Sequence, residues 1–553
     1  MKRIHVIIPA AGEAKRMRPL SDNLSKALIP VNGKPIISWI FDELKEIPNI
    51  ASITIVQKRH DIENFISSTY ECTEIGSKVR YVDQDFRYNG PGGAIISGLK
   101  EIGYNAEDGL LIWLGDTICK YNDFDFSTSF LGTSQTPAIE SKRWCIAEFN
   151  NHGYLNTLHD KKKIYHPEIL DALIGIYYVD SIVDFNEFIP NIKESPETEI
   201  QISELLFKYG YERFKKLDLT KFWYDCGELE TYYQSKARLI NFAAREQTKL
   251  DVDLERQTVT KSSLTEHNRK KLKNEYDWFK SCTGTRQIYV PKIIDYSSNS
   301  FEYSYTMSYE SGTTLSDMFC YENIDVDTWF SLIRKVLRIY HSNFVVNPYY
   351  KNADKIFTEL EKNFYIRKCI DRFIEYQDTY KKYLTQDDDI VIHAFFEKLK
   401  DNMPNKSNHL VNSMVDDNLI HGDFHFGNIL YDSILNKYTF LDPRGGDFWN
   451  LFTDSNYDMA KLYHDIYCGY MLIIQNLYKI ENNEVVFSDK HMKLLKELEA
   501  SIDPILESYE YNPKYIKMLA ISLVFSCVPF HLDDPEHCKA FILRSVQLMK
   551  EYI

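Results

Sequence analysis

The chain has 553 residues, and because one hydrophobic core rarely serves more than about 100 to 200 residues, this length predicts at least two domains. Apolar residues make up 44% and charged residues 26%, proportions that exclude a largely disordered chain and a fibrous repeat. The net charge is -15, from 65 Lys and Arg against 80 Asp and Glu, so the chain has no general attraction for nucleic acid or anionic lipid. We therefore expect neither nucleic acid nor a membrane among its partners.

The cysteine pattern and the apolar runs indicate a cytoplasmic protein. The 10 cysteines include no CxxC pair, so neither a zinc knuckle nor a disulfide framework is predicted. Residues 1–12 pass from a basic pair and a short apolar run straight into a loop, without the apolar segment of an export signal. The longest apolar run, 518–530, is interrupted by polar residues and is shorter than a membrane span requires.

The first half of the chain alternates short apolar runs with helical stretches. Buried strands are predicted at 4–8, 52–56, 78–82 and 109–116, and an amphipathic helix at 37–47. This alternation is typical of an α/β fold with a parallel sheet.

The pattern changes near residue 245. Leu250, Val252 and Leu254 alternate with polar residues, which predicts antiparallel strands. Beyond residue 325 the apolar residues follow the spacing of one helix face: Trp329, Leu332, Ile333, Val336, Leu337 and Tyr340. We expect one domain over 1–245 and a second over 246–553, the latter with a smaller lobe to about 312 and a helical lobe over 313–553.

A loop of small residues follows the first strand, at the edge where α/β sheets bind ligands. Its backbone N–H groups can approach a phosphate, and Arg16 and Lys26 can add positive charge. The whole segment resembles the signature of the nucleoside-diphospho-sugar pyrophosphorylases in its Gly12, Arg16, Pro19-Leu20, Lys26-Ala27-Leu28 and 30–35 (PVNGKP). It departs from that pattern at Ala14, where the family has a second glycine.

The resemblance implies a Rossmann-like nucleotidyltransferase domain and a role for each matching residue. Arg16 and Lys26 would be catalytic, and Asp116 and Asp225 would bind Mg²⁺, since two carboxylates suit an ion that bridges phosphates. Nucleotide binding is expected of Ala11, Gly12, Gln84, Gly90 and Gly92, and sugar binding of Gly175 and Glu199.

The second half carries the segment LIHGDFHFGNIL at 419–430, followed by FLDPRG at 440–445. These resemble the catalytic loop and the metal-binding Asp of the aminoglycoside phosphotransferase and choline kinase family, a branch of the protein-kinase fold. The resemblance implies a bilobal α+β domain in which Asp423 orients an acceptor hydroxyl, while Asn428 and Asp442 hold Mg²⁺ on ATP.

Fainter signals complete this second site. Lys261 and Glu275 are expected to form an ion pair that positions the ATP phosphates, and the segment around Met307 to be the hinge whose backbone binds adenine. Asp458, Lys461 and His425 are interpreted as structural supports of the catalytic loop.

Together the two resemblances predict a bifunctional enzyme with Mg²⁺ in both sites. A kinase would phosphorylate a small hydroxyl compound with ATP, and a nucleotidyltransferase would couple the product to a second NTP. A sugar phosphorylated at its anomeric position is favoured, for supply of a surface-polysaccharide precursor. Two alternatives stay open: choline or a small alcohol or phosphonate with a cytidylyltransferase, and a kinase with a non-catalytic sensing module. The base, the acceptor, channelling and the oligomeric state are not predicted.

Overall fold

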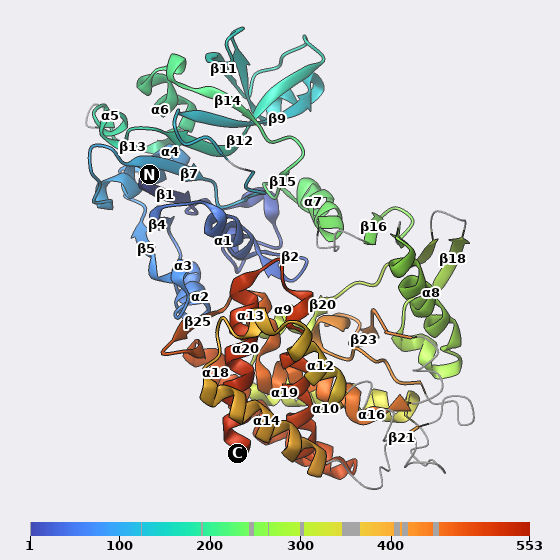
Figure 1. Ribbon diagram of the computed structural model, residues 1–553. Coiled ribbons are helices and arrows are strands. Elements are labelled where there is room, and N and C mark those ends of the chain that lie inside the picture. The colour runs from blue at the N-terminus through green and yellow to red at the C-terminus, as the bar shows by residue number, and fades with distance from the viewer. Residues whose placement is uncertain are drawn as a thin grey trace. The chain divides into compact units, whose positions relative to one another are not determined.

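In the computed structural model the chain divides into two units, Met1–Ser67 with Glu74–Leu239 and Ser68–Thr73 with Ile240–Ile553 (Figure 1). The structure describes residues 2–122, 124–189, 192–242, 248–263, 265–298, 303–345, 365–402, 410–411, 419–445 and 453–553. The expected domain boundary at 245 lies outside these described residues.

A nine-stranded sheet forms the centre of the first unit, in the order β11-β10-β12-β7-β1-β4-β5, with β9 and β14 joined through β12. The strands are β1 (Ile4–Pro9), β4 (Ile50–Gln57), β5 (Val79–Asp83), β7 (Gly109–Trp113), β9 (Phe130–Pro137), β10 (Cys145–Phe149), β11 (Leu155–Asp160), β12 (Ile169–Val179) and β14 (Lys215–Asp218).

The sheet is parallel only in part. Strands β7, β1, β4 and β5 run parallel, whereas β12 pairs antiparallel with β7. The expected parallel sheet is therefore correct for these four strands and wrong beyond β7. Because the chain leaves β1 toward β4 on one side and returns as β7 on the other, the edge after β1 is a topological switch point, where α/β sheets bind ligands.

Helices cover the sheet because their apolar residues recur at helical spacing. In α1 (Ile36–Glu46) the residues Ile36, Ile37, Ile40, Phe41 and Leu44 are buried, close to the expected helix at 37–47. The other helices of this unit are α2 (Asp61–Thr69), α3 (Glu74–Ser77), α4 (Gly90–Glu101), α5 (Ile182–Asn186), α6 (Ile202–Tyr209) and α7 (Leu229–Phe242).

Short two-stranded ribbons stand apart from the main sheet and join distant segments. They pair β2 (Pro30–Val31) with β3 (Lys34–Pro35), β6 (Tyr88–Asn89) with β13 (Ser195–Glu199), and β8 (Thr117–Cys119) with β15 (Trp223–Asp225).

The second unit begins with an antiparallel sheet in the order β16-β17-β19-β18. Its strands are β16 (Thr248–Asp253), β17 (Thr258–Ser263), β18 (Ile293–Ser298) and β19 (Tyr303–Ser308), and α8 (Glu266–Ser281) follows β17. The antiparallel pairing agrees with the alternation read from the sequence, although Leu254 lies in the turn after β16.

The remainder of this unit is mainly helical. All six apolar residues of the expected helix face are buried in α10 (Val326–Asn343). The other helices are α9 (Leu315–Tyr321), α12 (Arg367–Glu375), α13 (Gln377–Tyr380), α14 (Gln386–Asp401), α16 (Ser455–Tyr463), α17 (Tyr470–Ile474), α18 (Asp489–Ser508), α19 (Pro513–Phe525) and α20 (Pro535–Met549). Short strands pair β20 (Thr313–Thr314) with β22 (Ile429–Asp432), β22 with β23 (Lys437–Phe440), β21 (Leu410–Val411) with β24 (Thr453–Asp454), and β25 (Tyr478–Glu481) with β26 (Glu484–Phe487).

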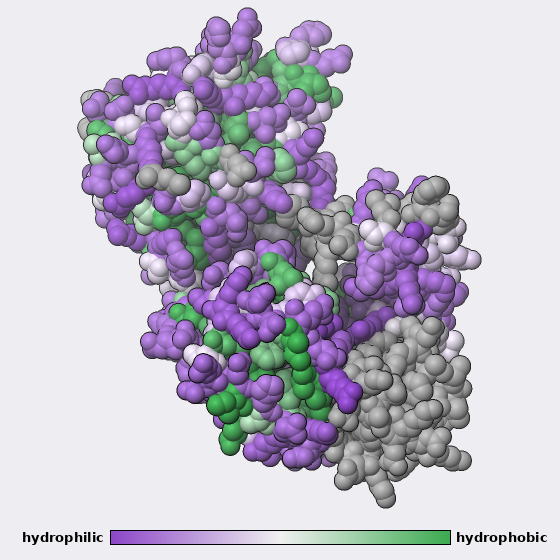
Figure 2. All heavy atoms as spheres, in the orientation of Figure 1, coloured by the Kyte–Doolittle hydropathy of each residue, from purple (hydrophilic) through white to green (hydrophobic). Residues whose placement is uncertain are grey.

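The surface shown in Figure 2 is mostly hydrophilic, with apolar residues scattered between charged ones. Across the described residues, no helix combines the length and the apolar character that crossing a membrane requires.

Candidate active sites

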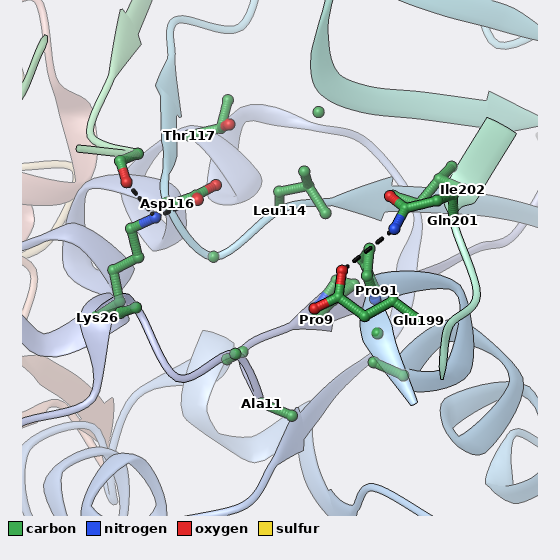
Figure 3. Close-up of a pocket in the computed structure, with 18 of the residues that line it drawn as sticks. Pro9, Ala11, Lys26, Pro91, Leu114, Asp116, Thr117, Glu199, Gln201 and Ile202 are labelled. Atoms are coloured by element: carbon green, nitrogen blue, oxygen red, sulfur yellow. Dashed lines mark hydrogen bonds and ion pairs between the residues drawn. The ribbon is translucent and has the colours of Figure 1, made fainter. Parts of the chain in front are cut away.

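A cavity of about 580 Å³ lies where the loops after β1 and β7 meet (Figure 3). Every residue that the sequence singles out in this unit lines it except Gly92: Ala11, Gly12, Arg16, Lys26, Gln84, Gly90, Asp116, Gly175, Glu199 and Asp225. Residues widely separated in the sequence therefore share one pocket.

The loop after β1 keeps its turn despite having alanine where the resembled family has glycine. Ala14 has φ 50° and ψ 36°, a left-handed conformation that glycine adopts more easily. The Ser21 hydroxyl donates to the Ala14 carbonyl at 2.8 Å and supports the turn. Arg16 follows on a short 3-10 helix, with its side chain 67% exposed. The Ala14 backbone thus adopts the left-handed conformation although the residue carries a Cβ.

Lys26 and Asp116 point toward each other in the pocket (Figure 3), and Asp225 lines the same cavity. Lys26 Nζ donates to Asp116 Oδ2 at 2.7 Å and to the Gly227 carbonyl at 2.8 Å. Pairing of β8 with β15 sets Asp225 opposite Thr117, and the Cys226 N–H donates to the Asp116 carbonyl at 3.1 Å. Asp116 follows β7, which ends at Trp113 rather than at 116 as expected.

The charges of these carboxylates suit a divalent cation. Burial raises the pKa of Asp225, and the neighbouring Asp116 carboxylate raises it further. Burial also favours the neutral form of Asp116, but Lys26 outweighs it and holds that pKa below its usual value. Among the described residues, no group of three or more His, Cys, Asp and Glu side chains is placed to hold a metal ion. Asp116 and Asp225 would supply two carboxylates. Mg²⁺ commonly binds in this way, with substrate phosphates and water as its other ligands.

The start of α4 forms a third wall of the pocket. Gln84 Nε2 donates to the carbonyls of Tyr88 and Gly90, both at 2.9 Å, and Asn89 Oδ1 accepts the Gly90 N–H at 2.8 Å. Glu199 lies beside Asn89 through the β6–β13 pairing, and a Cβ on Gly90 would come within 2.7 Å of the Glu199 Cβ. Glycine is thus required for this close approach.

Two of the other predicted glycines have packing roles. The Gly92 N–H donates to the Ile200 carbonyl at 2.8 Å, and a Cβ there would lie 2.7 Å from that oxygen, so this glycine allows close packing of the chain. Gly175 interrupts β12 with φ 89° and accepts the Leu114 N–H at 2.9 Å, which brings its backbone to the pocket wall.

The sequence did not predict several pocket residues, because they lie outside the recognised motifs. Lys58 and Lys161 add positive charge, and neither makes an ion pair within the described part of the chain. Trp144 and Trp223 lie perpendicular with ring centroids 5.2 Å apart. Arg143 and Glu228 also line the cavity and form an ion pair.

The catalytic-loop motif of the second unit is held by Asp458. Its carboxylate accepts the N–H groups of His421 and Gly422 and the hydroxyl of Tyr340, each at 2.7 Å. Burial raises the pKa of Asp458 to about 7. These contacts are those of a structural support, as expected from the sequence.

Lys461, which was expected to support the catalytic loop, contacts the carboxylate of that loop. Its Nζ lies 3.1 Å from Asp423 Oδ1, whereas His425 Nε2 lies 3.7 Å from Asp423 Oδ2. Burial favours a neutral Asp423, but Lys461 and His425 outweigh it and hold the Asp423 pKa well below its ordinary value. Lys461 therefore contacts the predicted catalytic carboxylate directly.

The residues expected to bind Mg²⁺ and the ATP phosphates lie together. Asn428 Nδ2 donates to the Asp423 carbonyl at 2.9 Å, and the Leu441 N–H donates to the Asn428 carbonyl at 2.9 Å, next to Asp442. Lys261 Nζ donates to Glu275 Oε1 at 2.5 Å and also to Asp442. An amide and a carboxylate oxygen are donors that suit Mg²⁺, so this set also fits the ion.

Met307, expected in the hinge segment, lies in a strand. It lies within β19, which pairs on one side with β17 and on the other with β18. Its backbone is thus part of the sheet, and the first residues after the strand are Tyr309 and Glu310. The alternation of residues in a sequence does not reveal at which residue a strand stops pairing with its neighbours.

A cationic cluster is here defined as Lys368, Arg372, Arg444 and Lys461, whose charges act on one another, and its member Lys461 contacts Asp423. Burial lowers the pKa of Lys368 to about 7, and the charges of Arg444 and Arg372 lower it further, with a smaller contribution from Lys461. Arg372 donates to the Ser526 carbonyl at 2.8 Å. Nothing in the spacing of these residues predicted that they would gather.

The comparisons with known proteins concern the first unit. Residues 6–123 match the family model of the MobA-like NTP transferase domain. The N-terminal unit is therefore a nucleotidyltransferase-type α/β domain.

The relatives of this unit include proteins named for nucleotidyl transfer. The low-salt glycan biosynthesis nucleotidyltransferase Agl11 of Haloferax volcanii is 25% identical over 235 residues, 40% of this chain and 62% of that protein. A glucose-1-phosphate thymidylyltransferase of Mycobacterium tuberculosis is 26% identical over 205 residues, 36% of this chain and 68% of that protein. The chain thus spans less than two thirds of the first relative. A solved UDP-glucose pyrophosphorylase complexed with UDP-glucose is 22% identical, over 43% of this chain and 99% of that one, with a TM-score of 0.37.

Proposed function

We propose that the first unit joins a sugar 1-phosphate to a nucleoside triphosphate and releases pyrophosphate. The observation that carries this proposal is the single cavity in which Arg16, Lys26, Asp116 and Asp225 meet at the carboxyl edge of the sheet. The sugar-phosphate relatives support the substrate class.

The residues of the cavity suit an in-line attack by the sugar phosphate on the α-phosphorus. The loop around Gly12 would bring backbone N–H groups to the triphosphate, and Lys26 would neutralise charge that develops at the α-phosphate. Asp116 and Asp225 would hold Mg²⁺, which screens phosphate charge. Alignment and charge neutralisation can provide the acceleration without a covalent intermediate.

We propose that the second unit is a kinase that supplies the phosphorylated substrate. Asp423 would orient the acceptor hydroxyl, Lys261 and Glu275 would position the ATP phosphates, and Asn428 and Asp442 would hold Mg²⁺. The ion pair from Lys261 to Glu275 and the proximity of Asp442 support this arrangement. Fusion would keep the product of the first reaction near the second site. Precursor supply for a surface polysaccharide is the proposed setting.

A second candidate is choline phosphorylation followed by cytidylyl transfer. The perpendicular pair Trp144 and Trp223 favours it, because aromatic faces can bind a quaternary ammonium group. Two observations weigh against it: the Arg143 guanidinium already lies 5.4 Å from the Trp144 ring centroid, and the Lys461 ammonium group, 3.1 Å from Asp423, would repel a cationic acceptor. We therefore favour a sugar.

The test is incubation of the purified full chain with Mg²⁺, ATP, each NTP in turn and a panel of sugars, choline and alditols. Mass spectrometry of the products identifies both the acceptor and the base of the NTP that is used. Formation of a nucleoside-diphospho-sugar supports the proposal, and formation of CDP-choline replaces it with the second candidate.

Single substitutions assign each reaction to its site. Asp423→Ala should abolish only the phosphorylation of the acceptor, and Asp116→Ala only the nucleotidyl transfer. If the first unit were a non-catalytic sensing module, Asp116→Ala would leave every product unchanged. Loss of both reactions in either folded variant would contradict the assignment to two sites.

A further inference from the structure

One carboxylate in the N-terminal pocket bridges two guanidinium groups. Glu228 Oε1 forms an ion pair with Arg143, and Glu228 Oε2 lies 3.6 Å from Arg16. All three residues line the cavity. They come from three separate segments: the 3-10 helix Lys15–Met17, the 3-10 helix Ala138–Arg143, and the residue that precedes α7.

The exposure of these side chains lets another anion displace the Glu228 carboxylate from the two guanidinium groups. The side chains of Arg143 and Glu228 are 27% and 23% exposed, and that of Arg16 is 67% exposed. Ion pairs with this access to water contribute only about 0 to 1 kcal/mol. A phosphate presents oxygens to guanidinium groups much as a carboxylate does, but with more charge and one more acceptor atom.

Arg143 has few competing partners. Its other ion pair, to Glu140 of the same 3-10 helix, is 3.6 Å long, and its guanidinium lies over the Trp144 ring. Aromatic contact holds the planar group in one orientation without using its N–H donors. The guanidinium therefore stays directed at the position that the Glu228 carboxylate occupies.

We propose that Arg16 and Arg143 form a two-arginine clamp for the pyrophosphate portion of the triphosphate, and that Glu228 occupies this clamp in the free enzyme. The inference rests on the proposed nucleotidyl transfer. Glu228 leaves the clamp when the triphosphate binds. After transfer it competes with the pyrophosphate product for the same two guanidinium groups.

Direct binding of inorganic pyrophosphate, measured by calorimetry on the full chain at fixed Mg²⁺, tests the clamp. Arg143→Met should raise the Kd about 10- to 30-fold, the effect expected for lost hydrogen bonds between charged groups. Glu228→Gln should lower the Kd about 3- to 10-fold, because the neutral amide competes less well for the two guanidinium groups. In the Arg143→Met background, Glu228→Gln should lower the Kd by a smaller factor, because only Arg16 is then released from the Glu228 carboxylate.

Matched controls come from a surface pair of the same unit. Arg213 and Asp184 form an ion pair at 3.0 Å and do not line the cavity, so Arg213→Met and Asp184→Asn should leave the Kd unchanged. A Glu228→Gln variant that binds pyrophosphate no better than the wild type, or an Arg143→Met variant that binds it equally well, overturns the clamp. Failure of the proposed function is read separately, as absence of any nucleotide–sugar product from the wild-type chain.

Discussion

At the scale of single residues, Ala14 shows how a local departure from a motif is tolerated. Its left-handed backbone conformation keeps the loop after β1 in place, although a Cβ in this region is unfavourable by about 1 to 2 kcal/mol. Glycine at this position would relieve that strain but lose more conformational entropy on folding.

We therefore expect Ala14→Gly to raise the free energy of unfolding of the first unit by about 0.5 kcal/mol, the difference between these two effects. Nucleotidyl transfer should be retained. Ala94→Gly is the matched control, since Ala94 lies inside α4 and the same change should destabilise the unit by about 1 kcal/mol. Urea denaturation measures both, and a destabilised Ala14→Gly variant would contradict the strain argument.

Lys461 is a second residue whose role depends on its neighbour. Because its ammonium group lies 3.1 Å from Asp423 Oδ1, it orients the carboxylate that the proposed kinase reaction uses. It is a positioning residue, since it acts through Asp423.

Lys461→Met should lower kcat for acceptor phosphorylation about 100-fold while KM for ATP changes less than about threefold, as expected when an interaction specific to the transition state is lost. Lys461→Arg should restore part of kcat, because a guanidinium can still reach the carboxylate. Steady-state kinetics with both variants checks this. An equal loss in the Met and Arg variants would indicate a role in folding alone.

At the scale of elements, the two-stranded ribbons assemble the first pocket. The β8–β15 ribbon brings Asp225 to Asp116, and the β6–β13 ribbon brings Glu199 to the start of α4. Helix α1 supports the same region: Glu43 Oε2 accepts the Tyr121 N–H at 2.7 Å, and burial raises the pKa of Glu43 from 4.5 to about 7.

This pKa predicts how stability depends on pH. Between about pH 4.5 and 7 the unfolded chain ionises Glu43 while the folded unit keeps it protonated, so the free energy of unfolding falls as pH rises. Above pH 7 Glu43 is ionised in the folded unit as well, and the full cost of burying its charge lowers the free energy of unfolding.

Glu43→Gln removes the charge and keeps an oxygen for the Tyr121 N–H. At pH 8 the variant should be more stable than the wild type by about 1 to 3 kcal/mol, and at pH 4 the two should be equal. Thermal unfolding at both pH values measures the difference. A gain of the same size at pH 4 and pH 8 would exclude ionisation of Glu43 as its cause.

At the scale of the whole molecule, the chain combines a nucleotidyltransferase-type unit with a second unit for which we propose kinase activity. The acidic net charge of -15 is compatible with phosphate substrates because the pocket lining includes local cationic groups such as Arg16, Lys26, Lys58 and Lys161. Each proposed reaction depends on residues of one unit only.

Two inactive variants should therefore complement each other. A mixture of Asp116→Ala and Asp423→Ala chains should convert acceptor, ATP and NTP to the final product, because the phosphorylated intermediate diffuses from one chain to the other. Product formation is followed by mass spectrometry, with each variant alone as the control. If both half-reactions are present but the mixture forms no product, the intermediate is not released.

The sequence by itself determined the class of the first fold and singled out ten of the residues that line its pocket. Strand periodicity and the loop motif are local properties, so Gly12, Arg16 and Lys26 could be predicted, and the Lys261–Glu275 pair was also expected. The antiparallel half of the sheet, the strand position of Met307 and the packing role of Gly92 could not be predicted, because each depends on which distant segment lies alongside.

Only the tertiary structure decided which side chains meet. Arg143 and Glu228 belong to no motif, and the contacts of Glu228 with Arg16 and Arg143 arise from segments that are far apart along the chain. Lys461 was expected to support the catalytic loop, but its contact with Asp423 is seen only in the structure. A carboxylate or an ammonium group looks the same in a sequence whether it faces water or another charge. Its distance to a partner is a property of packing, and that distance determines whether it acts in a site.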